Sequence, residues 1–156
     1  MKSTDVLNMV DPKYALFGFF FAFNNRLQTA GDAFYEEITC KQFFLLACMN
    51  LFSDTAPTAN DLAKIMGCSR QNVKEILTSL EKKGLVTLTQ CETDKRKRTV
   101  TLTKKAEQIA DKYKEKETEF LERLFDGATD EQIRSTYCFL SKLEDNLKII
   151  NEEIRK

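Results

Sequence analysis

Residues 68–86 read CSRQNVKEILTSLEKKGLV, and residues 94–98 read DKRKR. The first stretch has apolar residues at i, i+3, i+4 and i+7, which predicts an amphipathic helix. These residues are Val73, Ile76, Leu77 and Leu80. Ser69 fits its N-cap, and Gly84 stands where a helix end needs a positive φ. A strand, a basic turn and a second strand follow, an order typical of a helix-turn-helix with a β-wing.

A shorter helix precedes this one. Thr58 fits its N-cap and Gly67 its end, so two short helices are joined by a glycine-containing turn, as in a helix-turn-helix. After Gly84, apolar residues alternate with threonines at 85–90 and again at 99–102. This alternation predicts two antiparallel strands that are joined by the charged loop 91–98.

The rest of the chain predicts helices at 13–29, from Thr39 to the break at 53–57, at 103–125 and from Thr129 to about Ile154. Two of these begin with capping boxes, Thr39 with Gln42 and Thr129 with Gln132. The chain has 156 residues, with only 5 Gly and 2 Pro to interrupt helices. The predicted fold is therefore mainly α, with six helices and a small two- to three-stranded β-wing.

The two end segments carry apolar residues that need cover. Five phenylalanines within residues 17–23 occupy more than one face of the first helix. The last helix repeats Ile133, Leu140, Leu147 and Ile154 at sevens, with Leu143 and Ile150 three residues after two of them. This is the a/d seam of a coiled coil, which favours a homodimer joined through terminal helices. The alternative is that both helices lie on the core of a single chain.

Charge is concentrated in the middle of the sequence. The chain has 24 Lys and Arg against 24 Asp and Glu, a net charge of zero. Residues 58–105 hold 11 Lys and Arg against 5 Asp and Glu, a net charge of +6, so the flanks hold −6. This distribution suits a protein that contacts phosphate with one face only.

The residues expected to contact double-stranded DNA lie on the second short helix and the wing. Amide side chains pair with adenine, and arginine with guanine, in the major groove. The major-groove candidates are Arg70, Gln71, Asn72, Lys74 and Thr78, and the wing candidates are Asp94, Lys95, Arg96, Lys97 and Arg98. Thr58 and Ser69 are helix caps that are also expected to contact phosphate. The alternative is an ordinary solvated helix face.

Other functions are disfavoured. The chain has no His, no P-loop and no GxGxxG, so no catalytic site, metal or cofactor is predicted. Glu36 and Glu37 are interpreted as solvated charge. Five cysteines without a CxxC indicate thiols in a reducing cytoplasm, with Cys91 a candidate redox sensor. The apolar run 14–23 ends after ten residues, too short to span a membrane.

The sequence resembles the MarR family of bacterial transcriptional regulators. The resemblance rests on residues 60–63 (NDLA), 69–73 (SRQNV), 80–86 (LEKKGLV) and the wing motif Asp94-Lys95-Arg96 with Leu102-Thr103. It implies a homodimer that binds a near-palindromic operator, often released by a small apolar or phenolic effector. Two positions depart from the family pattern, Ala106 where Gly is usual and Glu75 where a basic residue is frequent.

The resulting hypothesis is a homodimeric, sequence-specific DNA-binding regulator that acts as a repressor. Residues 1–34 and 104–156 would form its helical dimerisation domain, and residues 35–103 its winged helix-turn-helix domain. An effector pocket is expected at Phe17, Phe20, Phe21 and Phe44. Two alternatives stay open: a winged-helix module that docks on an acidic protein, and a regulator gated by cysteine oxidation.

Overall fold

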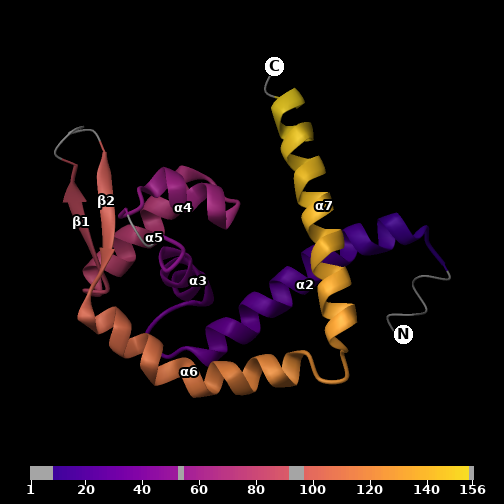
Figure 1. The fold of residues 1–156 in the computed structure, drawn as a ribbon, viewed down its shortest axis with the longest axis horizontal. Coiled ribbons are helices and arrows are strands. Elements are labelled where there is room, and N and C mark those ends of the chain that lie inside the picture. The colour runs from indigo at the N-terminus through magenta and orange to yellow at the C-terminus, as the bar shows by residue number, and fades with distance from the viewer. Residues whose placement is uncertain (1–8, 53–54, 92–96, 155–156) are drawn as a thin grey trace. The chain divides into compact units, whose positions relative to one another are not determined.

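The computed structural model describes residues 9–52, 55–91 and 97–154. In these residues the chain forms six helices and one two-stranded sheet (Figure 1). The elements are α2 (Pro12–Phe34), α3 (Cys40–Met49), α4 (Ala59–Met66), α5 (Arg70–Lys82), β1 (Val86–Gln90), β2 (Arg98–Leu102), α6 (Lys104–Leu124) and α7 (Asp130–Ile154). The mainly α fold with a small wing is confirmed.

Side-chain caps set the starts of these helices. Thr39 and Thr58 each close a capping box, with Gln42 and Asp61 as the residues that reach back. Ser69 Oγ accepts from the Asn72 amide at 3.2 Å, and Thr129 exchanges hydrogen bonds with Gln132. Because these bonds satisfy backbone donors that the first helical turn leaves free, they fix each helix start within a residue of its predicted place.

Helix α2 is longer than the sequence predicts. It continues past the expected end at Thr29 to Phe34. Gly31 lies buried inside it, and a Cβ at this position would stand 2.7 Å from the Cβ of Cys40. The Cys40 amide also donates to Asp32 Oδ1 at 2.7 Å. Gly31 is therefore required by the close approach of α3 and does not end the helix.

The wing pairs β1 with β2 in antiparallel register, Val86 opposite Leu102 and Gln90 opposite Arg98. The segment before α4 adds a further contact to the same sheet. Thr58 forms an isolated bridge with Thr99, and the Val100 amide donates to the Pro57 carbonyl at 2.9 Å. This bridge adds a second pairing to the β1–β2 pair, which the predicted two- to three-stranded wing allows. It fixes the start of α4 beside the wing.

The buried core lies within the first of two compact units, Met1–Tyr113 and Lys114–Lys156. Its largest fully buried side chains include Tyr113, Leu45, Leu62, Leu77, Leu80 and Leu85. Between residues 114 and 154 no side chain is buried, and Leu121 and Leu124 of α6 are exposed in the single chain. The dimerisation role of residues 1–34 and 104–156 stays a prediction.

None of the helices among the described residues is both long enough and apolar enough to cross a membrane.

Candidate nucleic-acid interface

Helix α5 divides cleanly into a buried and an exposed side. Val73, Leu77 and Leu80 are at most 2% exposed. Of the predicted major-groove residues, Asn72 is partly buried and the others are exposed: Arg70, Gln71, Lys74 and Thr78. Burial of the apolar positions therefore leaves the polar face of α5 exposed, as the sequence periodicity predicts.

A hollow of about 370 Å³ lies between α5, the start of α4 and the middle and loop end of the wing strands. Arg70, Lys74 and Thr78 line it from α5, and Lys97 and Arg98 line it from the wing. Thr58 and Asn60 contribute from the start of α4, and Leu77, Leu88 and Val100 form an apolar floor. We call this hollow the basic groove. Its four cations lie near one another, so it presents a concentrated positive potential to an anionic partner.

The two capping residues differ in what they can still donate. Thr58 Oγ1 donates to Asp61 Oδ2 at 2.7 Å, and this hydrogen bond is the main cause of the lowered pKa of Asp61. Ser69 is exposed and uses its oxygen to accept from the Asn72 amide. Ser69 can therefore still offer its hydroxyl proton to a phosphate, whereas Thr58 must first release Asp61. Both phosphate contacts stay predictions.

The outermost part of α5 carries a hydrogen-bonded pair, Gln71 and Glu75, which we call the crest. Gln71 Nε2 donates to Glu75 Oε1 at 3.1 Å, and both side chains are exposed. The two residues are one helical turn apart, so they lie side by side on the helix surface. The sequence shows Glu75 as an acid on this side, but the pairing with Gln71 becomes evident only in the structure.

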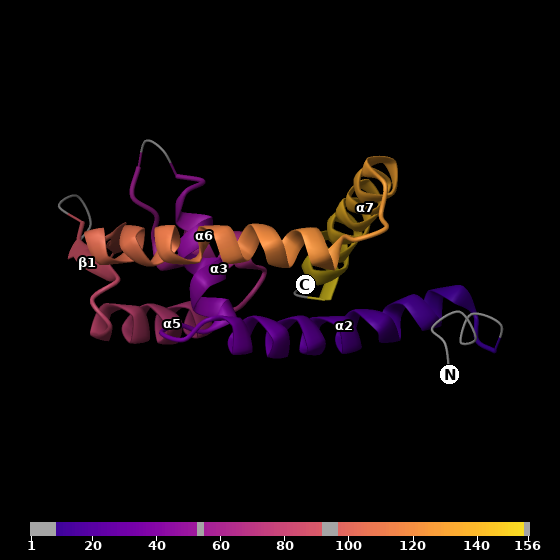
Figure 2. The same ribbon diagram turned by 90° about the horizontal axis from the view of Figure 1, so that it is seen from below.

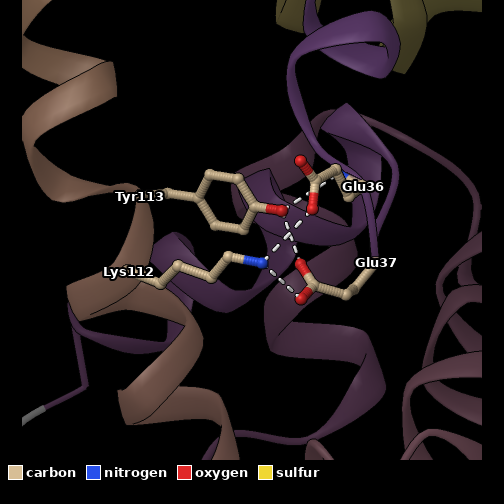
Figure 3. A network of polar contacts seen from close by, with 4 residues as sticks. All are labelled: Glu36, Glu37, Lys112 and Tyr113. Atoms are coloured by element: carbon tan, nitrogen blue, oxygen red, sulfur yellow. Dashed lines mark hydrogen bonds and ion pairs between the residues drawn. The ribbon is translucent and has the colours of Figure 1, made fainter.

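A polar network joins α6 to the segment between α2 and α3 (Figure 3). The Tyr113 hydroxyl donates to Glu37 Oε2 at 2.5 Å and accepts from the Glu36 amide at 2.9 Å. Lys112 Nζ lies 2.6 Å from Glu37 Oε1 and 3.4 Å from Glu36 Oε2. Hydrogen bonds from Lys112 and then Tyr113 lower the pKa of Glu37, and Glu37 in turn raises the pKa of Lys112. Glu37 is exposed, as its interpretation as solvated charge expects, and it also takes part in this network.

The same segment is tied to the far end of α5. Lys83 Nζ donates to the Glu37 carbonyl at 2.7 Å and to Gln42 Oε1 at 2.8 Å. Gln42 is buried, and its Nε2 donates to Ser79 Oγ at 2.9 Å. Ser79, a polar residue of α5, is half-buried in this network. The network therefore holds the C-terminal half of α5 against α3.

The other residues that the sequence predicts to be functional belong to the wing loop and the effector pocket. Asp94, Lys95 and Arg96 lie outside the described residues. Phe17, Phe21 and Phe44 are 62%, 63% and 48% exposed, and Phe20 is partly buried. The effector pocket assigned to these four residues stays a prediction. Cys91 is partly buried, and its amide donates to the Lys97 carbonyl at 3.0 Å, where the two wing strands meet the loop.

Residues 38–97 match the family model described as the MarR family. Over these residues the chain is similar to the MarR family. The match covers α3, α4, α5 and the first strand of the wing, so it includes the crest and most of the basic groove. The expected resemblance to this family is confirmed.

Solved structures of MarR-family proteins share the fold over most of the chain. A MarR protein from Peptoclostridium difficile aligns with a TM-score of 0.76 at 21% identity, over 88% of this chain and 89% of its own. A MarR/EmrR-family transcriptional regulator from Acinetobacter sp. aligns with a TM-score of 0.77 at 15% identity, over 89% and 99%. MepR from S. aureus, solved as a complex with DNA, aligns with a TM-score of 0.75 at 20% identity, over 88% and 98%.

Proposed function

We propose that the protein is a transcriptional regulator of the cytoplasm that binds double-stranded DNA as a homodimer and represses from a near-palindromic operator. The observation that carries this proposal is the basic groove, where Arg70 and Lys74 of α5 meet Lys97 and Arg98 of the wing. A duplex presents phosphates on both sides of its major groove, so cations beside a groove-entering helix match its backbone. MepR, a structural neighbour, is solved with DNA bound, which supports this proposal.

The proposed homodimer follows from the apolar side chains that the single chain leaves uncovered. Helix α7 has 25 residues and none is buried. Leu140, Leu147 and Ile150 of its heptad seam are 41%, 57% and 47% exposed. Exposed apolar surface of this extent marks an interaction site, and a heptad seam is matched by a second copy of itself. Two copies would present two winged helices along one duplex.

The test is the salt dependence of binding to duplex DNA, measured by fluorescence anisotropy with operators selected from a randomised library. Removing one cation that touches a phosphate should make the slope of log K against log salt shallower by about 0.9. We expect Lys74→Ala, Arg98→Ala and Arg96→Ala each to do so. Arg123→Ala is the matched control, because Arg123 is exposed on α6 and pairs with Glu119. Wild-type slopes in all three variants would exclude the groove and wing from the interface.

An alternative function is that the winged helix docks on an acidic protein. One observation favours it: the Glu75 carboxylate at the crest is repelled by a polyanion such as DNA. Failure of the wild-type protein to bind any duplex at low salt would favour it over DNA binding.

Release by a phenolic effector, or by oxidation at Cys91, also stays a prediction. A melting shift with phenolic acids tests the first, and peroxide treatment of wild type and Cys91→Ser tests the second.

A further inference from the structure

The two exposed rows of α5 face different surroundings. Arg70, Lys74 and Thr78 line the basic groove next to the wing, so they face the place where a DNA backbone would pass. The crest lies outside that row. At 3.6 residues per turn, Gln71 and Glu75 are about 160° and about 200° around the helix from Val73, which is fully buried. The crest is thus opposite the core, where a groove-entering helix meets base edges.

The crest offers hydrogen-bond acceptors. Because Gln71 Nε2 donates to Glu75 Oε1 at 3.1 Å, the amide nitrogen is turned toward the carboxylate. Glu75 keeps its second oxygen, and Gln71 keeps its carbonyl oxygen, for a group outside the chain. An ionised carboxylate can only accept, so it needs a donor opposite it.

The major groove restricts which base can supply that donor. Guanine presents N7 and O6, both acceptors, and thymine presents O4 and a methyl group. Adenine presents a donor beside the acceptor N7, which a carboxylate repels. Cytosine presents its N4 amino group with no acceptor on the same base edge. A carboxylate at the crest therefore fits cytosine better than the other three bases.

We propose that Glu75, oriented by Gln71, reads the N4 amino group of one cytosine in each operator half-site. This inference rests on the proposed function and adds a specificity-determining residue to it. Arg70, Lys74 and Thr78, which the sequence predicts in the major groove, in this proposal contact the backbone instead and supply affinity. The crest supplies discrimination. The same carboxylate is repelled by phosphates, so Glu75 lowers binding to every duplex that lacks the cytosine.

The experiment selects duplexes from a library randomised over two helical turns and then measures anisotropy with the four bases at each half-site position. The wild-type protein should prefer C at one position by about tenfold, within the discrimination of one good base contact. Glu75→Gln and Glu75→Ala should lose that preference and bind non-cognate duplexes more tightly. Gln71→Ala should weaken it, since the carboxylate loses its orienting partner. Glu81→Gln is the matched control, because it removes an equal charge from an exposed position of α5.

Thermal melting of each variant establishes that it is folded, as expected for exposed positions. An unchanged base preference in both Glu75 variants would overturn the inference while leaving DNA binding intact. A Glu81→Gln effect equal to that of Glu75→Gln would also overturn it, because the effect would then be one of charge alone. Absence of wild-type binding to all duplexes at low salt would instead overturn the proposed function, and the inference with it.

Discussion

At the scale of single residues, Tyr113 combines an apolar and a polar role. Its side chain is fully buried, and its ring lies 5.9 Å from that of Phe34 and 5.0 Å from that of Tyr35. Its hydroxyl forms hydrogen bonds with Glu37 and with the Glu36 amide. Tyrosine at this position fills the core with its ring and forms hydrogen bonds with its hydroxyl. Phenylalanine would fill the core but could not form those hydrogen bonds.

Tyr113→Phe should lower the free energy of unfolding by about 1–3 kcal/mol, because it leaves Glu37 and the Glu36 amide without their buried partner. Chemical denaturation measures this loss. Tyr137→Phe is the control, since Tyr137 is 74% exposed and should change the free energy little. Equal effects of the two substitutions would show that the hydroxyl of Tyr113 contributes nothing specific.

The pH dependence of stability should report on Glu37. Its pKa in the folded chain lies below the usual 4.5, mainly because of Lys112 and then Tyr113. A carboxyl with a lowered folded pKa adds stability that is complete above its unfolded pKa and is lost as pH falls through the folded value. Wild type should therefore exceed Glu37→Gln in melting temperature at neutral pH, and the difference should shrink below about pH 4.

Lys112→Met provides the second arm of this experiment. It removes the largest cause of the shift while keeping an unbranched side chain that is one atom shorter. The melting temperature of this variant should fall less on acidification than that of wild type. A difference between wild type and Glu37→Gln that stays constant from neutral to acid pH would contradict the assignment of the network.

At the scale of elements, Gly31 determines how closely α2 and α3 approach. Gly31→Ala should lower the free energy of unfolding by about 1–3 kcal/mol, because the added methyl overlaps the Cys40 side chain and forces the helices apart. A double-mutant cycle with Cys40→Gly provides the check. The alanine should cost much less when Cys40 is glycine, and a cost that is additive in the double variant would place the strain elsewhere.

The helices and strands could be predicted because local signals in the sequence mark them. The contacts between residues far apart in the sequence could not be predicted. Ser69, Thr58 and the two capping boxes mark helix starts through bonds that span three residues. The exposed face of α5 followed from its 3.6-residue period. Tyr113 and Glu37 are 76 residues apart, and Gln42 and Ser79 are 37 apart. No periodicity couples such positions, so the network and the half-buried place of Ser79 became evident only from the fold.

At the scale of the whole molecule, the heptad seam of α7 leads to a test of self-association. Leu147→Lys should raise the dissociation constant of the homodimer at least about a hundredfold, since two symmetric copies each lose the burial of a leucine, about 1.5–3 kcal/mol apiece. Sedimentation velocity over a range of concentrations measures this. Glu152→Lys is the control, because residue 152 lies away from the seam. Sedimentation of the wild-type protein as a monomer would remove the basis for two DNA-binding domains on one operator.

Tyr113 is the last buried residue in the described part of the chain, yet α6 continues without a break to Leu124 (Figure 2). One helix therefore has a core around its first half and none around its second. Deuterium uptake should reveal this as a step within a single helix, with slow exchange up to Tyr113 and faster exchange from Lys114 onward. Dilution should accelerate exchange only beyond the step, because cover by a second copy depends on concentration and cover by the chain's own core does not.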